Sequence, residues 1–218
     1  MTTVAAVLHR TGSDGQAQAA SITGGLIRFM DVVVALGGLI FFFPTLLMIA
    51  VAVKLQDGGP SLFRHERVGR GGRPFACLKF RSMTVDAQAR LPELIDQEWI
   101  ERRKLRQDPR VTRLGRFLRL SSLDELPQLI NVLKGDMSLV GPRPIVEDEI
   151  ALYGRHFAAY RAVRPGLTGL WQVSGRNDIP YPRRVAMDVW LVRNLTVRTY
   201  LVLLARTVPA VLTREGVH

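Results

Sequence analysis

The sequence has a single cysteine, Cys77, among its 218 residues. One cysteine cannot close an intramolecular disulfide, which excludes the small disulfide-stapled secreted domains and fits a reducing compartment. Cys77 lies in an apolar run and is expected to be a small buried hydrophobe. The four histidines are scattered, at positions 9, 65, 156 and 218, and form no Cys/His cluster with metal-ligand spacing. No histidine is therefore assigned a catalytic role.

Acidic residues are also scarce relative to basic ones. The chain has 30 Lys and Arg against 19 Asp and Glu, a formal net charge of +11. A charge of this size predicts an anionic partner and says nothing about the fold. Nucleic acid, anionic lipid and nucleotide phosphates all qualify.

Charge is missing altogether from residues 32–53. As a helix rising about 1.5 Å per residue, this run can span a hydrocarbon core of about 30 Å, although a buried helix of a soluble protein is the alternative. Pro44 lies inside the run and predicts a kink, because proline removes a backbone donor and clashes with the preceding turn. The run is either a kinked spanning helix or a helix–break–helix that returns to the same face. Basic residues flank the run on both sides, so the distribution of positive charge does not distinguish a spanning helix from one that returns to the same face.

The rest of the chain predicts an α+β fold that is mainly helical. Residues 1–24 predict a flexible tail. Residues 62–68 and 73–81 predict a small β-hairpin around a glycine-rich turn. Helices are expected at 87–106, 113–120, 126–133, 147–162, 181–194 and 197–213, with a short strand at 170–173. Residues 113–120 have the pattern of a basic amphipathic helix lying on a membrane, or of an ordinary surface helix.

Two adjacent carboxylates, Asp124 and Glu125, follow this basic helix. A capping box from Ser122 to Glu125 would place both in the first turn of a helix, which is the simplest account of them. An aspartate can also attack phosphorus to give an acyl phosphate. A neighbouring carboxylate then helps to hold the divalent ion that chemistry on a diphosphate usually needs. The pair alone leaves both accounts open.

Several cations stand in or beside turns and strand ends. Taken singly, each is an ordinary solvated charge. Arg143 is held between two prolines, and Arg176 lies between a glycine and an asparagine. A guanidinium on a fixed backbone suits bidentate phosphate recognition. The candidate phosphate-binding cations are Lys79, Arg81, Arg119, Arg143 and Arg176.

The order of several motifs resembles that of a known family. They are residues 79–83 (KFRSM), 122–126 (SLDEL), 131–138 (NVLKGDMS), 140–144 (VGPRP), 163–169 (VRPGLTG), 172–177 (QVSGRN) and 188–194 (DVWLVRN). Each motif is modest, but in this order they are similar to the bacterial monotopic phosphoglycosyl transferases. These enzymes transfer a sugar 1-phosphate to polyprenyl phosphate at the start of polysaccharide and glycoconjugate assembly.

The resemblance implies a ping-pong reaction. Asp124 would attack the β-phosphate of a UDP-sugar and release UMP, and the phosphosugar would pass to polyprenyl phosphate. Glu125 would bind Mg²⁺ (or Mn²⁺) together with Asp124. Lys79, Arg119 and Arg176 would hold phosphates, with Arg143 a weaker candidate. Asp188 matches an acidic family position near the site.

The family also implies where each part of the chain lies. Residues 25–56 would be embedded in the membrane as a re-entrant helix with its break at Pro44. Here the chain has Phe43-Pro44 where the family often has Ser-Pro. Residues 57–218 would form the catalytic domain on the cytoplasmic face of the bacterial inner membrane. The expected partners are a UDP-sugar, polyprenyl phosphate and membrane phospholipids, with a homodimer as one option for the assembly and no nucleic acid. The alternative is a non-enzymatic basic scaffold anchored to anionic lipid.

Overall fold

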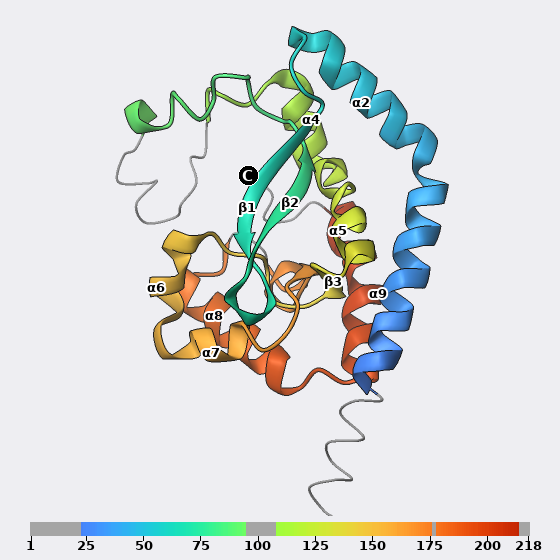
Figure 1. Ribbon diagram of the computed structural model, residues 1–218, viewed down its shortest axis with the longest axis vertical. Coiled ribbons are helices and arrows are strands. Elements are labelled where there is room, and N and C mark those ends of the chain that lie inside the picture. Colours follow the sequence, from blue (N-terminus) through green and yellow to red (C-terminus); the bar gives the residue numbers. More distant parts are fainter. Residues whose placement is uncertain (1–22, 95–107, 176–177, 214–218) are drawn as a thin grey trace, which may run out of the picture.

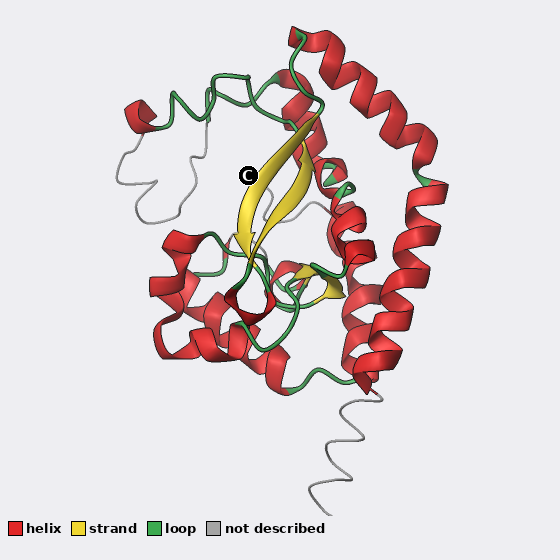
Figure 2. Ribbon diagram, in the orientation of Figure 1, coloured by secondary structure: helices red, strands yellow, loops and turns green. Residues whose placement is uncertain are grey.

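The computed structural model describes residues 23–94, 108–175 and 178–213. Within these ranges the protein is mostly helical, with two small two-stranded sheets (Figures 1 and 2). The helices are Thr23–Phe41, α2 (Phe43–Asp57), α4 (Arg113–Leu120), α5 (Gln128–Lys134), α6 (Ile150–Tyr153), α7 (Phe157–Tyr160), α8 (Tyr181–Arg193) and α9 (Val197–Thr213). The strands are β1 (Leu62–Val68), β2 (Pro74–Phe80), β3 (Ser138–Val140) and β4 (Gly166–Thr168). The predicted mainly helical α+β fold with a small hairpin is confirmed; most of the predicted tail lies outside the described residues.

The N-terminal helix and α2 form a bent arc along one side of the molecule (Figure 1). The first helix ends at Phe41, Phe42 is a turn residue, and Pro44 stands in the first turn of α2. Proline suits this position because its missing N–H has no partner there. Thr23–Phe41 is long and apolar enough to cross a membrane. The arc exposes many large apolar side chains: Leu26, Phe29, Val33, Val34, Leu36, Ile40, Phe41, Phe43, Leu47, Met48, Val51 and Leu55.

Polar side chains attach this arc to the rest of the protein. Asp31 is 1% exposed and accepts hydrogen bonds from the backbone N–H of Leu139 (2.8 Å), the hydroxyl of Ser138 (3.0 Å) and the hydroxyl of Tyr200 (2.9 Å). A buried carboxylate needs such donors to offset its lost hydration. Arg28, one turn earlier, donates to carbonyl oxygens in the last turn of α5 at 2.6 and 2.9 Å. The first helix is therefore fixed against β3, α5 and α9.

The hairpin forms as predicted. β1 and β2 pair antiparallel from Leu62 opposite Phe80 to Val68 opposite Pro74. The connecting turn contains Gly71 and Gly72, both with φ in the left-handed region that glycine favours.

The second sheet was not predicted. β3 and β4 are parallel and extremely close, since a Cβ atom on Gly166 would lie 2.1 Å from the backbone nitrogen of Gly141. Gly166 also donates to the carbonyl oxygen of Pro142 at 2.7 Å, which fixes the turn that carries Arg143. The strand expected at 170–173 is wrong, because residues Trp171–Val173 form a 3-10 turn instead.

Two other helix predictions need correction. Residues 147–162 are divided into short segments, because Gly154 leaves the helical region with φ 48° and ψ −127°. Residues 87–94 form turns and a 3-10 segment (Pro92–Leu94) rather than a helix. The remainder of that predicted helix, to Arg106, lies outside the described residues. Gly135 ends α5 in the left-handed conformation, as expected.

Candidate active site

The two adjacent carboxylates lie in a tight turn between α4 and α5. Leu123–Glu125 is a 3-10 turn (η3), and the residue before it, Ser122, has φ 56° and ψ 14°. Ser122 is the only residue other than glycine with positive φ in the part of the chain that the structure describes. The predicted capping box is wrong, since the Ser122 side chain makes no capping bond there. The strained serine instead turns the chain so that both carboxylates meet the hairpin.

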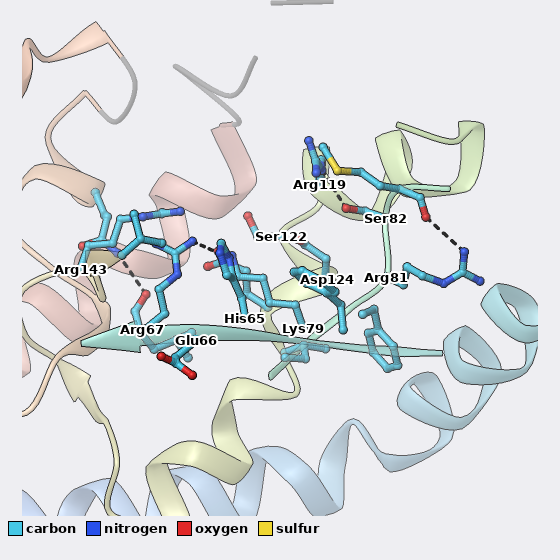
Figure 3. A pocket seen from close by; sticks show the side chains of 18 of the residues that line it. His65, Glu66, Arg67, Lys79, Arg81, Ser82, Arg119, Ser122, Asp124 and Arg143 are labelled. Carbon is cyan, nitrogen blue, oxygen red and sulfur yellow. Dashed lines mark hydrogen bonds and ion pairs between the residues drawn. The ribbon is translucent and has the colours of Figure 1, made fainter. Parts of the chain in front are cut away.

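Both carboxylates line a cavity of about 1240 Å³. Its walls come from the hairpin, α4, η3, the β3–α6 connection, the Trp171–Val173 turn, α8 and α9. Asp124 is only 8% exposed. In Figure 3, Asp124 and Lys79 lie near the centre, Arg119 and Ser82 on one side, and His65, Arg67 and Arg143 on the other.

Glu125 is paired with a lysine from the hairpin. Lys79 Nζ lies 2.5 Å from Glu125 Oε1. Burial works to raise the pKa of Glu125, but the charges of Lys79 and Arg143 and the Lys79 hydrogen bond outweigh it and lower the pKa to about 2. Glu125 is therefore ionised at any physiological pH.

Asp124 has the opposite shift. Burial, followed by the neighbouring Glu125 charge, raises its pKa to about 6, against the lowering effect of Lys79, Arg119 and Arg143. Asp124 is thus ionised near neutral pH but more basic than an ordinary aspartate. Two adjacent carboxylates with separated pKa values are suited to different chemical roles.

Arg119 approaches the pair from the last turn of α4. Its Nε donates to the hydroxyl of Ser82 at 2.8 Å, which holds the guanidinium at the cavity wall. Burial lowers the pKa of Arg119 and the Asp124 charge raises it, so the arginine and the aspartate stabilise each other's charge. This geometry suits a phosphate-binding cation.

Arg143 lies farther along the cavity, above an aromatic ring. Its guanidinium carbon is 5.8 Å from the centre of the Trp171 ring, and that of Arg184 is 4.8 Å from the same ring. Cations over an indole face are attracted by its quadrupole. Trp171 therefore supports two guanidinium groups that face the cavity.

Arg81 has a different environment from the other candidates. Its guanidinium forms an ion pair with both carboxylate oxygens of Asp57 and donates to the carbonyl oxygens of residues 53, 60 and 83. These contacts use all five of its N–H donors. In Figure 3 it extends away from Asp124. Arg81 therefore ties the hairpin to the end of α2 and has no donor left for a phosphate in this structure, which departs from its predicted role.

Asp188 lies beneath the cavity rather than in its wall. It is 1% exposed, and its Oδ2 accepts from the hydroxyl of Tyr153 at 2.7 Å. Burial raises the pKa of Asp188 to about 7, and the nearby Tyr153 and Trp171 groups counteract this. Trp171 is close, but its indole N–H and Asp188 Oδ1 are outside hydrogen-bonding geometry. Asp188 is thus held by Tyr153 and does not line the cavity.

One predicted residue remains, and two residues of the cavity wall were not predicted. Arg176 lies outside the described residues. His65 and Arg67, both in the cavity wall, were not selected from the sequence. Arg67 Nη2 lies 2.9 Å from His65 Nδ1, and since arginine can only donate, Nδ1 accepts and the proton is on Nε2. Burial and nearby cations lower the pKa of His65 to about 4, so it is neutral. The alternation of β1 places both residues on the face of the strand that carries the site, a signal available in the sequence.

The cavity around Asp124 and Glu125 offers few carboxylates to a divalent ion. The described residues contain no group of three or more His, Cys, Asp or Glu side chains suited to a metal. Mg²⁺, however, is often held by one or two carboxylates plus substrate phosphates. Asp124 and Glu125 fit that limited ligand set.

A carboxylate that is more basic than usual, an ionised neighbour and several cations around one cavity are suited to the chemistry of phosphate groups. Residues 23–214 match the bacterial sugar transferase family, and the chain belongs to that family.

Individual relatives agree with this assignment. The chain is 48% identical over 199 residues to the undecaprenyl-phosphate galactose phosphotransferase of Salmonella typhimurium, covering 88% of this chain and 42% of that protein. It is 47% identical over 200 residues to the exopolysaccharide production protein ExoY of Rhizobium meliloti, covering 88% of each. It is 42% identical over 199 residues to the UDP-glucose:undecaprenyl-phosphate glucose-1-phosphate transferase of Caulobacter vibrioides, covering 71% of that protein. The chain thus spans less than half the length of some relatives and most of the length of others.

Proposed function

We propose that the protein transfers a sugar 1-phosphate from a UDP-sugar to polyprenyl phosphate, through a covalent phosphosugar on Asp124. The observation that carries this proposal is the raised pKa of a buried aspartate that faces a cavity lined with cations. A more basic carboxylate is a better nucleophile, and the cations offset the charge of a diphosphate. The names of the relatives, which include undecaprenyl-phosphate sugar transferases, supply the substrate classes.

In the first step an Asp124 oxygen attacks the β-phosphorus of the UDP-sugar. A bond forms from that oxygen to phosphorus, and the bond from phosphorus to the bridging oxygen breaks, so that UMP leaves with the electron pair. Arg119 and Lys79 lie where they can hold the phosphate oxygens. Glu125, already ionised and paired with Lys79, fixes the position of that cation.

In the second step a phosphate oxygen of polyprenyl phosphate attacks the same phosphorus. The bond to Asp124 breaks, the carboxylate is restored, and polyprenyl-diphospho-sugar is released. Asp124 is the nucleophile in the first step and the leaving group in the second. Polyprenyl phosphate attacks from the side that UMP has left, so the same cations serve both substrates in turn.

Asp124 and Glu125 would hold Mg²⁺, or Mn²⁺ in its place. When bound, such an ion neutralises charge on the diphosphate. Arg143 and Arg184, stacked on Trp171, would bind the more distant parts of the nucleotide.

We further propose that the arc of the N-terminal helix and α2 is embedded in the membrane as a re-entrant segment, with the rest of the chain on the cytoplasmic face. The break at Phe42 and the apolar side chains exposed on both helices support this placement. Single cysteines introduced at Ser13 and at the exposed Arg70, with the buried Cys77 left in place, test it. Both should react with an impermeant thiol reagent from the same side of a sealed vesicle. Reaction from opposite sides identifies a spanning helix instead.

The activity itself is tested with the purified protein, Mg²⁺, polyprenyl phosphate and a panel of UDP-sugars. One UDP-sugar should give UMP and polyprenyl-diphospho-sugar in equal amounts. Absence of UMP with every donor would contradict the proposed function. The panel also identifies the sugar, which a few cavity contacts decide.

A further inference from the structure

Helix α9 is apolar on its inner face and largely apolar on its outer face, which also exposes Arg198 and Arg206. Its inner face carries Tyr200, Leu203, Leu204, Thr207, Ala210 and Val211. Its outer face exposes Leu201, Val202, Val208 and Leu212 by 49%, 44%, 62% and 73%. A surface helix in water keeps a polar outer face, so this one is suited to contact lipid on the outside. It lies beside the N-terminal helix (Figure 1), to which the hydrogen bond from Tyr200 to Asp31 ties it.

The inner face of α9 contacts the hydrophobic core near the start of the helix and the cavity farther along it. Tyr200 and Leu203 are 0% and 3% exposed and belong to the hydrophobic core. One to two turns later, Thr207 and Ala210 line the cavity that contains Asp124. The Thr207 hydroxyl lies 2.8 Å from the carbonyl oxygen of Leu203 and 2.9 Å from the hydroxyl of Thr168. Because that hydroxyl is satisfied within the protein, this wall of the cavity is effectively apolar.

Other apolar residues face the same part of the cavity. Leu126, which directly follows Glu125, and Leu167 from β4 pack with Leu204 against one hydrophobic cluster. The cavity also reaches Phe42, at the break between the first two helices. Its neighbours Phe41 and Phe43 are 75% and 63% exposed. One continuous cavity therefore has charged walls around Asp124 and an apolar arm bounded by α9.

We propose that this apolar arm binds the first isoprene units of the acceptor's hydrocarbon chain, with α9 as one wall of its entrance from the membrane. This inference rests on the proposed function, because it assumes a prenyl phosphate acceptor. A ligand with a phosphate head and an apolar chain matches a cavity with one charged and one apolar end. A UDP-sugar is polar throughout and gains nothing from the arm. Burial of each methylene group adds roughly fourfold in affinity, so even a short buried stretch of chain matters.

Two alanines of α9 provide a matched pair for the test. Ala210 lines the cavity, whereas Ala205 is exposed on the other side of the same helix. Ala210→Trp should fill the arm, and Ala205→Trp should leave it open. The readout is the gain in kcat/KM as the acceptor is lengthened from a C5 to a C15 prenyl phosphate in the same detergent. We expect at least a tenfold gain for the wild type and for Ala205→Trp, and less than threefold for Ala210→Trp. An equal gain in all three proteins overturns the proposal.

A burst of UMP in the absence of acceptor separates this proposal from the proposed function. Ala210→Trp should still release one UMP per protein, because the donor does not use the arm. If the wild type gives no burst and no turnover, the proposed function fails. If the wild type works and chain length has no effect, only the arm assignment fails.

A labelling measurement on the unmodified chain covers the case in which Ala210→Trp does not fold. A photoreactive C15 prenyl phosphate should label the tryptic peptide that begins at Thr207. Excess unlabelled C15 prenyl phosphate should prevent this labelling, and phosphatidylglycerol should not. Labelling that both compounds prevent equally, or that neither prevents, contradicts a specific site on α9.

Discussion

The helical arc and the cavity have opposite polarity. On the arc, Phe41 and Phe43 are 75% and 63% exposed, whereas in the cavity Asp124 is 8% exposed. Soluble proteins show the reverse, with apolar groups inside and carboxylates in water. Each region needs compensation, because exposed apolar surface needs a covering and a buried charge needs partners.

The two regions obtain that compensation differently. The cavity supplies its own partners, since Lys79 pairs with Glu125 and Arg119 faces Asp124. The described part of the arc leaves the apolar side chains of its outer face uncovered, and polar contacts of Asp31, Arg28 and Asp57 attach its inner side. This difference agrees with the proposed roles, in which the paired charges act on a bound substrate and the arc contacts the apolar interior of the membrane.

Neutralising the buried aspartate of the cavity should have the largest effect. Asp124→Asn should reduce UMP release by at least about a thousandfold, because an amide cannot act as the nucleophile. Its melting temperature should rise, because the fold raises the pKa of Asp124 and so disfavours the ionised form. The gain in unfolding free energy should be on the order of 1–3 kcal/mol. The exposed Glu93→Gln, which lies outside the cavity wall, is the control and should change neither activity nor melting temperature. Comparable turnover in Asp124→Asn would exclude this residue as nucleophile.

Two arginines of α4 allow a residue in the cavity wall to be compared with one on the surface. Arg119 is held against the cavity by Ser82, whereas Arg116 is exposed. Arg119→Met should lower kcat/KM for the UDP-sugar by roughly 10- to 100-fold, since charge-assisted hydrogen bonds to phosphate are worth about 1.5–3 kcal/mol. Arg116→Met should stay within about twofold. Steady-state kinetics of both variants measure this difference. Equal losses of kcat/KM in the two variants would show that the effect comes from the overall charge of the protein.

The pH dependence separates the two carboxylates. Without a divalent ion, Asp124 should take up a proton near pH 6, whereas Glu125 should not titrate until about 2. The stability contribution of the raised Asp124 pKa is present below its ordinary value of 3.8 and is lost as the pH rises through about 6. Denaturant unfolding of metal-free wild type and Asp124→Asn between pH 4 and 8 should therefore differ most above pH 6. A difference in unfolding free energy that stays constant from pH 4 to 8 would contradict the raised pKa of Asp124.

The smallest expected effect concerns the arc. Phe43→Asp should weaken binding to lipid vesicles severalfold, because it removes exposed apolar surface and adds a charge beside the helix break. The burst of UMP in detergent should change little, since Phe43 does not line the cavity. Co-sedimentation with vesicles measures the first quantity. Unchanged sedimentation would show that this part of the arc does not contact the membrane.

Local sequence signals predicted some elements well. The hairpin follows from two strand patterns around glycines, and α5 ends at Gly135 because glycine accepts the left-handed conformation. The Asp124–Glu125 pair was found from its neighbours. The capping box failed because Ser122 adopts a left-handed conformation, which only its tertiary surroundings can impose.

Local sequence signals did not predict contacts between segments that are far apart in the chain. The β3–β4 pair depends on glycines 141 and 166 meeting across the fold, which no local pattern reveals. Arg81 and Arg119 were both predicted to bind phosphate. In the structure Arg81 forms an ion pair with Asp57, whereas Arg119 donates to Ser82 and stays at the cavity wall. The same limit applies to Asp188, whose burial beneath Trp171 is a property of the packed core.

Mass spectrometry can detect the covalent phosphosugar on Asp124 after brief incubation of the protein with the UDP-sugar and Mg²⁺ without acceptor. We expect a mass increase equal to one sugar phosphate, located to the peptide that contains Asp124. The increase should be absent from Asp124→Asn and should disappear when polyprenyl phosphate is added. A fully active protein that shows no such adduct, or carries it on another residue, would exclude Asp124 as the nucleophile.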